Sequence, residues 1–211
     1  MSALKRSFYN RPTVEVARAL LGHLLVRSEG GRLLVGRIVE TEAYVGEEDP
    51  ACHAARGRTA RNEVMYGPPG YSYVYFTYGM HHCLNAVTER EGYPAAVLLR
   101  AVEPLAGVER MCERRGIQRS GEGAAPDPRI ASGPARLAQA FGLTREHSRL
   151  DLTRDDGALR IERAGPRRRE RVGVSGRIGI SVARETQWRF FIEGNVHVSR
   201  GPRAAGEGRD S

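Results

Sequence analysis

The chain has 211 residues and a formal net charge of +8. This length fits a single domain with a substantial core, and the positive charge favours an anionic partner. Only one of the 33 basic residues is a lysine, Lys5, which disfavours a reaction that forms a Schiff base on an internal lysine.

The first predicted elements are one helix, two strands and a long loop. Pro12–Leu21 places its apolar residues on one helical face, as in a short amphipathic helix. His23–Arg27 and Arg32–Tyr44 are predicted strands, joined by a turn at Ser28–Gly31. Gly46–Gly70 contains much Gly and Pro and few apolar runs, so we expect an extended functional loop there.

The middle of the chain predicts a hairpin, a buried strand and a helix. Gly70–Tyr78 and Cys83–Thr88 are predicted strands that a Tyr-Gly turn joins into a hairpin. Ala95–Val102 is a continuous apolar run, which is typical of a buried strand. The next helix is expected to run from Pro104 to about Arg115, with the proline in its first turn.

A charged loop and a second helix follow. Arg119–Pro128 is predicted to be a flexible loop. The second helix is expected to have Ser132 as its N-cap, Pro134 near its first turn and Gly142 at its end.

The remaining residues predict strands and a polar tail. The strands are expected at Leu159–Arg163, Arg177–Val182 and Arg189–Glu193, and the tail, Gly201–Ser211, is expected to be disordered. No repeat or linker divides the chain, so residues 1–200 should form one domain. Its predicted class is α+β, with a curved, mostly antiparallel β-sheet, flanking helices and a protruding β-hairpin.

Cysteine usage and the N-terminus bear on the location of the protein. The first ten residues carry two basic side chains and no apolar run, so we expect no signal peptide. No apolar stretch approaches the roughly 20 residues of a membrane span, and no membrane partner is expected. Cys52, Cys83 and Cys112 are odd in number and widely spaced, which predicts free thiols in the cytoplasm.

A carboxylate and a row of aromatic rings are predicted to line one surface. Residues i and i+2 of a strand share a face, so Glu42 and Tyr44 point to the same side. Tyr71, Tyr73 and Tyr75 alternate in the same way on another strand. Rings can stack on a flat aromatic base, and a carboxylate can supply proton chemistry or charge stabilisation. Ordinary strand propensity also explains tyrosines in a strand, so the pattern alone leaves both interpretations open.

Five segments carry a more specific signal: RIVETEAYVGEEDPACHA, RGRTARN, YVYFTYGMHHCLN, VLLRAVEPLAG and SGPARLAQAFG. Their order and separations, over roughly residues 15–200, resemble those of the alkyladenine (3-methyladenine) DNA glycosylase family, in a bacterial-type form. The resemblance implies a monofunctional base excision repair enzyme that hydrolyses the N-glycosidic bond of a flipped-out purine and leaves an abasic site. The implied substrates are 3-methyladenine, 7-methylguanine, hypoxanthine and ethenoadenine in double-stranded DNA. A monomer without a cofactor is expected.

The resemblance also implies a catalytic set. Glu42 matches the general base that activates water; Glu40 shares its face by strand parity, and only the resemblance separates the two. Arg100 ends the apolar run VLLR, and the resemblance places it beside the nucleophilic water. The main-chain carbonyl of Ile178, in the run RIGI, would accept the other hydrogen of that water.

A base pocket is implied by four further matches. Tyr44, His53 and Tyr75 match residues that cover the two faces and the edge of the extruded base. Asn85 matches the residue whose bulk disfavours the exocyclic amine of guanine. The two His/Cys runs, at residues 52–53 and 81–83, lack the CxxC or HxxxH spacing of a zinc site, so no metal is expected.

DNA contacts are expected from the hairpin tip and from a basic loop. Tyr78 matches the family's wedge, which enters the minor groove and fills the vacated stack. Met80 and His81 would contact the groove beside it. Basic residues of the loop after His53 would bind phosphates without reading the sequence. These residues are Arg56, Arg58 and Arg61.

The sequence leaves two other functions as alternatives to a glycosylase. A non-catalytic nucleic-acid-binding module would use the tyrosines for stacking, although a carboxylate facing a phosphate-rich ligand argues against it. A metal-dependent nuclease would use Glu40, Glu42 and Asp49 as ligands. The run Arg167–Arg169 is interpreted as a solvated loop in preference to a phosphate contact.

Overall fold

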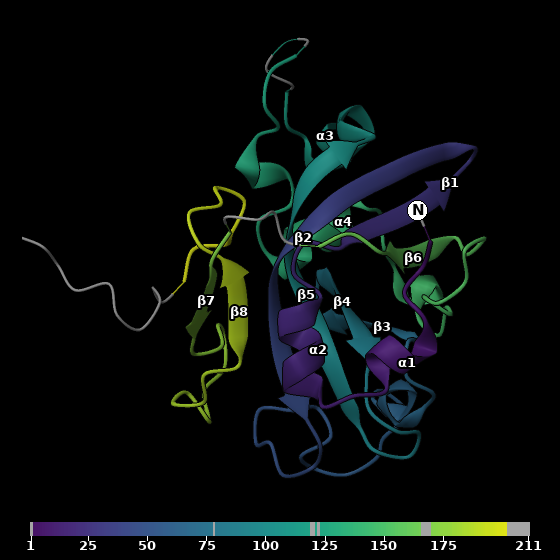
Figure 1. Cartoon of the computed structure of the whole chain (residues 1–211), viewed down its shortest axis with the longest axis vertical. Coiled ribbons are helices and arrows are strands. Elements are labelled where there is room, and N and C mark those ends of the chain that lie inside the picture. Colours follow the sequence, from purple (N-terminus) through teal and green to yellow (C-terminus); the bar gives the residue numbers. More distant parts are fainter. Residues whose placement is uncertain (1, 78, 119–120, 122, 166–169, 202–211) are drawn as a thin grey trace, which may run out of the picture.

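The computed structural model describes residues 2–77, 79–118, 121, 123–165 and 170–201, and it has one curved sheet at its centre (Figure 1). Its strands are β1 (Leu24–Glu29), β2 (Arg32–Val45), β3 (Ser72–Thr77), β4 (His81–Val87), β5 (Ala95–Ala106), β6 (Leu159–Glu162), β7 (Val172–Ser175) and β8 (Arg189–Ile192). They run in the order β3–β4–β5–β2–β1–β6, and the β7–β8 ribbon branches from β2. All of these pairings are antiparallel, so the predicted sheet is confirmed.

The longest strand, β2, is paired along both of its edges, and two different strands share one of these edges. β5 runs along one edge, whereas β1 covers the start of the other edge and β8 pairs with Glu40–Glu42. Shifts of register between Val35 and Gly36 and on either side of Glu40 mark bulges, which bend a strand and increase its twist. The bend allows two strands to share one edge of β2 and curves the sheet.

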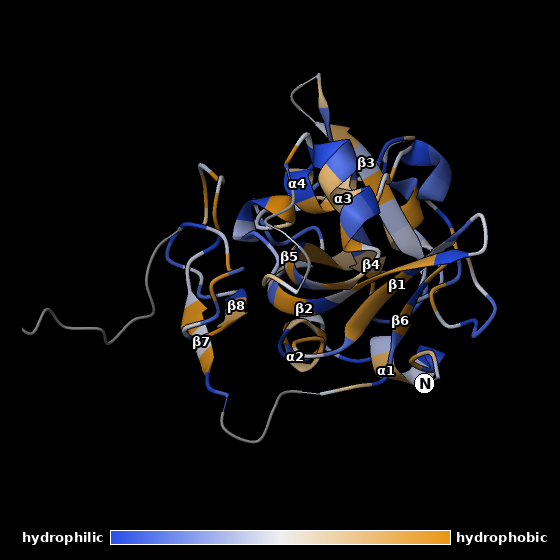
Figure 2. Ribbon diagram, turned by 90° about the horizontal axis from the view of Figure 1, so that it is seen from above, coloured by the Kyte–Doolittle hydropathy of each residue, from blue (hydrophilic) through white to orange (hydrophobic). Residues whose placement is uncertain are grey.

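Four helices flank the sheet in the described part of the chain. They are α1 (Arg6–Tyr9), α2 (Thr13–Ala19), α3 (Val108–Arg115) and α4 (Pro134–Ala140). Local sequence patterns predicted three of them, and α1 was not predicted. In Figure 2, α2 and α4 lie on opposite sides of β2 and β5. Val16 and Ala17 of α2 and Leu137 of α4 are completely buried in the main core, beside Phe141. Burial of such side chains is the main stabilising contribution to the domain.

The β3–β4 hairpin projects from the body of the molecule, as expected (Figure 2). Its strands are in register from Ser72 opposite Ala86 to Thr77 opposite His81. Tyr78, the predicted wedge, lies outside the described residues. The 3₁₀ turn Glu63–Tyr66 interrupts the long loop that precedes the hairpin.

Both predicted starts of the later helices are wrong. Pro104 lies inside β5, opposite Gly36 and at a shift of register, where a missing N–H is tolerated. α3 therefore begins only at Val108. Ser132 does not cap α4 either, because Gly133 is the residue before that helix and no side chain caps it.

The strand predicted at Arg177–Val182 is an irregular segment, and the unpredicted β7 lies just before it. Gly179 has a φ of 78°, which interrupts an extended chain. The N–H of Ile178 donates to the side chain of Glu42 instead of to a neighbouring strand. The alternation in RIGI fits a strand, but the segment serves as the wall of a cavity.

Three smaller expectations concern the cysteines, the membrane and the tail. Cys52, Cys83 and Cys112 are free thiols, as predicted, and all three are buried. In the described part of the chain, no helix combines the length and the apolar character needed to cross a membrane. The predicted tail and the run Arg167–Arg169 lie outside the described residues, with the exception of Gly201.

Candidate active site

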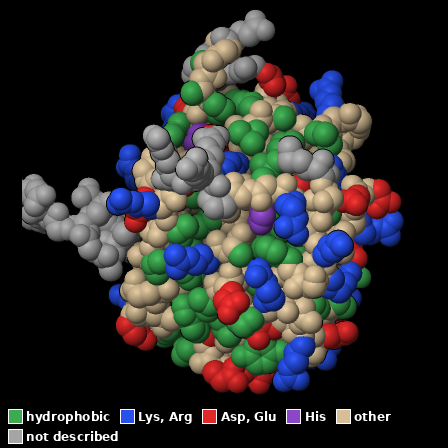
Figure 3. Space-filling model, viewed as in Figure 1, with side chains coloured by type: hydrophobic (Ala, Val, Ile, Leu, Met, Phe, Trp, Pro, Cys, Tyr) green, Lys and Arg blue, Asp and Glu red, His purple; other side chains and the backbone are tan. Residues whose placement is uncertain are grey.

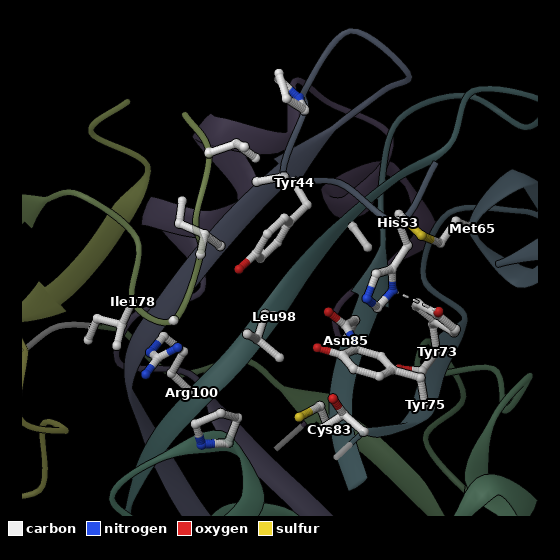
Figure 4. A pocket seen from close by; sticks show the side chains of 18 of the residues that line it. Tyr44, His53, Met65, Tyr73, Tyr75, Cys83, Asn85, Leu98, Arg100 and Ile178 are labelled. Atoms are coloured by element: carbon white, nitrogen blue, oxygen red, sulfur yellow. Dashed lines mark hydrogen bonds between the residues drawn. The ribbon is translucent and has the colours of Figure 1, made fainter. Parts of the chain in front are cut away.

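A cavity of about 450 Å³ opens between the sheet, the loop after β2 and the segment after β7 (Figure 4). Its volume lies within the range of pockets for small organic ligands. Its lining includes six of the seven catalytic and base-pocket residues singled out from the sequence. These are Tyr44, His53, Tyr75, Asn85, Arg100 and Ile178.

Aromatic side chains form two facing walls of this cavity. Tyr44, from β2, faces His53 and Tyr75 across the open space in Figure 4. The His53 ring meets Tyr75 edge to face at 4.4 Å between centroids, and its Nδ1 lies 3.0 Å from the hydroxyl of Tyr73. A flat ring entering between the walls would have π surfaces on both sides. Tyr71, predicted to share this face, does not line the cavity and packs under Arg6 instead.

Asn85 and Asn62 fix parts of the pocket through amide hydrogen bonds. Asn85 is buried in β4 and lines the cavity, and its amide donates to the carbonyl of Tyr73 at 3.1 Å, which fixes the side chain in the wall. Asn62, which the sequence did not reveal as functional, donates to the carbonyls of His53 at 2.8 Å and Gly57 at 2.9 Å. It thereby holds the loop that carries the histidine.

Glu42 is completely buried and accepts three hydrogen bonds from residues of the cavity wall. Its Oε1 accepts from the backbone N–H of Ile178 at 2.7 Å. Its Oε2 accepts from the Tyr44 hydroxyl at 2.9 Å and from Arg100 Nη1 at 3.2 Å. The Glu42 carboxylate therefore lies directly behind the residues that line the cavity. Its hydrogen-bond donors stabilise a negative charge on it. Its predicted proximity to Tyr44 is confirmed.

Glu40 lies on the same face of β2, as strand parity predicted, but it serves a different set of donors. It accepts from Arg100 Nε at 2.9 Å, Arg189 Nε at 2.7 Å and the backbone N–H of Ser199 at 2.7 Å. Burial alone would raise the pKa of Glu40, but the charges of Arg100 and Arg189 outweigh it and lower that pKa. Glu40 therefore remains ionised and anchors both arginines.

Arg100 bridges the two glutamates at the base of the cavity. Burial would lower the pKa of its guanidinium, but Glu42 and Glu40 raise it, so the group keeps its charge. Arg100 contacts both carboxylates while it also lines the cavity.

A buried ion pair that the sequence did not reveal holds two walls of the cavity together. Arg177 donates to both carboxylate oxygens of Asp49, at 2.5 and 2.8 Å, and to the carbonyl of Ala43 at 3.0 Å. Its guanidinium also stacks on the rings of Tyr44, at 4.8 Å, and Trp188, at 5.1 Å. The partners lie 128 residues apart in the sequence. The run RIGI was singled out only for the carbonyl of Ile178, so the sequence did not predict this ion pair.

The titratable rings of the cavity are neutral at physiological pH. His53 is exposed as a whole residue, but loss of water where its ring packs against Tyr73 and Tyr75 lowers its pKa to about 4, and the charge of Arg61 contributes. Burial also raises the pKa of Tyr44 well above its usual value, and Glu42 adds to that effect. Burial raises the pKa of Tyr75 as well. The walls therefore present uncharged rings, and the charges lie at the base.

This charge state predicts a specific titration of His53. We expect the NMR signals of His53 to show no protonation between pH 8 and about pH 5, because its folded pKa lies near 4. Since the unfolded chain takes up the proton near the ordinary pKa of 6.5, stability falls as the pH drops from about 6.5 toward 4. Arg61→Gln should raise the pKa, because it removes a neighbouring positive charge. An inflection near pH 6.5 in the wild type would contradict the assignment.

The predicted DNA contacts are dispersed around the cavity. Met80 is 68% exposed at the hairpin turn, and His81 is exposed beside it. Arg61 lies over the Tyr75 ring at 5.5 Å. Arg58 pairs with Glu63 at 3.1 Å and lies over the ring of Tyr66. Arg56 is exposed. The three arginines therefore do not form one cluster with a common orientation.

The carboxylates proposed for a metal-dependent nuclease are occupied by arginines. Glu40 and Glu42 bind Arg100, and Asp49 binds Arg177. Within the residues that the structure describes, no three His, Cys, Asp or Glu side chains are grouped as a metal would require. This geometry does not support the nuclease interpretation.

The face that carries α1 and α2 mixes arginines with acidic side chains (Figure 3). The hairpin projects from the other side of the sheet in Figure 2. Mixed charge gives little net attraction for a polyanion. The net positive charge of the chain is therefore not concentrated on this face.

Comparison with known proteins identifies the family. A family model described as methylpurine-DNA glycosylase (MPG) matches residues 7–196. A protein of Chlorobaculum parvum is 48% identical over 200 residues, which are 94% of this chain and 91% of the relative. Relatives from Methanocella arvoryzae (48% over 210 residues; 98% and 100% of the two chains) and Myxococcus xanthus (47% over 205 residues; 96% of each) are similar. All three are named "Putative 3-methyladenine DNA glycosylase". The chain belongs to the methylpurine-DNA glycosylase family.

Proposed function

We propose that this member of the family excises alkylated or deaminated purines from double-stranded DNA, with water as the nucleophile. Membership makes it a DNA glycosylase, a hydrolase of N-glycosyl bonds in DNA repair. The proposed substrates are 3-methyladenine, 7-methylguanine, hypoxanthine and ethenoadenine, and the proposed active form is a monomer. The observation that carries the proposal is an aromatic cavity that ends on a buried glutamate–arginine pair.

Extrusion of the base precedes the reaction in this proposal. The N-glycosidic bond of a stacked nucleotide is inaccessible, so the purine must leave the duplex and enter the cavity. Tyr44 would stack on one face of the base, and His53 with Tyr75 would cover the other. Asn85 would restrict the edge of the pocket. Tyr78 would fill the gap in the stack, with Met80 and His81 in the minor groove.

Glu42 is proposed to act as the general base. A water held between Glu42, Arg100 and the main-chain carbonyl of Ile178 would attack the sugar carbon as the bond from that carbon to the base breaks, and the base would leave with the bonding electron pair. The carboxylate would take a proton from the water and oppose the positive charge that develops on the sugar. The short contacts of Glu42 support this role, because they fix the carboxylate before the substrate arrives.

The proposed enzyme hydrolyses the N-glycosidic bond without cutting the DNA strand. A lyase step would need an amine that forms a Schiff base, and Lys5 is the only lysine of the chain. Lys5 lies beside α1 and does not line the cavity.

Release of free base tests the proposal. Duplexes that each contain one of the four lesions would be incubated with the protein, with and without EDTA, and the free base quantified by chromatography. We expect release of at least one damaged purine, unaffected by the chelator, with strand breaks only after alkali. Tight binding without any release would favour a non-catalytic module, and release lost in EDTA would favour a metal-dependent reaction.

Binding to undamaged duplex should depend steeply on salt. Among the described residues, Arg61, Arg136 and Arg145 form no ion pair with a carboxylate, and Arg136 follows the cavity residue Pro134. If about six phosphates are neutralised, the slope of log K against log salt is about −5. Arg61→Gln should reduce the slope by about 1. A flat response to salt would show that the basic residues do not bind phosphates.

A further inference from the structure

We propose that the Arg177–Asp49 ion pair positions both the stacking ring and the catalytic carboxylate of this site. Arg177 and Asp49 do not belong to the set of residues expected to touch DNA, and Arg177 does not line the cavity. The proposal rests on the proposed roles of Tyr44 and Glu42. It makes Arg177 a positioning residue, which acts only through its neighbours.

The pair supports the outer face of the Tyr44 ring. Tyr44 lines the cavity, whereas Arg177 and Trp188 do not, so the guanidinium lies on the side of the ring away from the base. Trp188 stacks on the guanidinium in turn. A base bound against Tyr44 would extend this stack on the cavity side. The ring would then be held between the base and a fixed cation, which limits its rotation.

The same pair fixes the peptide that binds Glu42. The next residue after Arg177 is Ile178, whose N–H lies 2.7 Å from Glu42 Oε1. Arg177 also donates to the carbonyl of Ala43, between Glu42 and Tyr44 in the sequence. The side chain therefore anchors the irregular segment to β2 at the point where the carboxylate and the ring emerge.

Asp49 connects this anchor to the loop that carries His53. Its carboxylate accepts from the backbone N–H of Val45 at 3.3 Å and of Ala51 at 3.1 Å, as well as from Arg177. Both side chains of the pair are almost completely buried. A buried ion pair is a poor source of stability compared with apolar residues, so its contribution here is better explained by geometry. Arginine suits this task because its planar fork can stack and bind a carboxylate at the same time.

The test separates stability from positioning by removing both charges together. The double variant Arg177→Met/Asp49→Asn leaves no lone buried charge, and the asparagine oxygen can still accept from one of the two backbone N–H groups. We expect its Tm to lie within about 4 °C of the wild type. Single-turnover release of a lesion that the wild type excises should fall by about 10–100-fold, because small displacements of reacting groups have effects of this size. Arg177→Lys should not restore the rate, since lysine cannot bind two oxygens and stack.

A second measurement does not depend on catalysis. The ratio of affinities for lesion-containing and undamaged duplex should fall in the double variant, while affinity for undamaged duplex is unchanged, because Arg177 is buried. Arg37→Met removes another buried, ion-paired arginine outside the cavity lining, and it should retain both the rate and the lesion preference.

The outcomes distinguish this inference from the function it rests on. A double variant that is folded, releases base at the wild-type rate and keeps its lesion preference would overturn the positioning role. Failure of the wild type to release any base would instead overturn the proposed function. In that case the lesion preference of the double variant still decides whether the pair positions the ring.

Discussion

Glu42→Gln is expected to slow the release of a damaged base by about 10²–10⁴-fold in single-turnover assays. The amide has nearly the shape of the carboxylate, but it cannot take the proton of the attacking water. Binding to a duplex with an abasic-site analogue should be largely retained, because that complex needs no proton transfer. Multiple-turnover excision near the wild-type rate would exclude Glu42 as the base.

Glu40→Gln is the matched control for this change. Glu40 has the same length and lies on the same face of β2, but its contacts are with Arg100, Arg189 and the backbone of Ser199. Loss of its charge should lower the Tm. The release rate of the folded protein should fall much less than it does in Glu42→Gln. Equal rate losses in both variants, at equal stability, would mean that the two carboxylates act only by holding Arg100.

Arg100→Met should have the largest effect on stability. Arg100 is buried between two glutamates, and its removal leaves Glu42 without its ion-pair partner among the described residues and Glu40 with Arg189. Breaking a buried ion pair in this way costs about 3–5 kcal/mol. For a domain of this size, the Tm should fall by roughly 6–20 °C in a thermal unfolding experiment.

Arg136→Met provides the corresponding surface control. Arg136 is exposed on α4 and contacts only Ser132 among the described residues, so its loss should change the Tm by less than about 2 °C. If Arg100→Met were as stable as this control, the glutamates would have to be satisfied by their other donors alone. Such a result would contradict the central role of Arg100 in the base of the cavity.

The strands near the site could be predicted because their alternation is local. Glu42 and Tyr44 share a face through strand parity, and Tyr73 and Tyr75 do so on β3. The register of the sheet, including the bulge at Glu40, could not be predicted, because it depends on pairing with distant strands. The sequence pattern therefore located the chemical groups, while their separation across the cavity required the fold.

The incorrect predictions have a common physical origin. Pro104, Ser132 and the segment Arg177–Val182 each carry a local signal that a long-range contact overrides. Pro104 is a normal first residue of a helix, but pairing of β5 with β2 extends the strand past it. The alternating residues after Arg177 resemble a strand, but their backbone binds Glu42. The Arg177–Asp49 pair escaped prediction for the same reason, since no short motif connects its partners.

The strand β2, held along both edges, carries the carboxylate and one stacking ring, whereas the mouth of the cavity is built from irregular backbone. Ile180, Ser181 and Val182 line that mouth, and they belong to no strand or helix. Substitutions there can change the shape of the opening without altering the pairing of β2. Substitutions at these three positions therefore offer a way to change what the opening admits, provided that the anchor of the segment to β2 through Arg177 and Ile178 is kept.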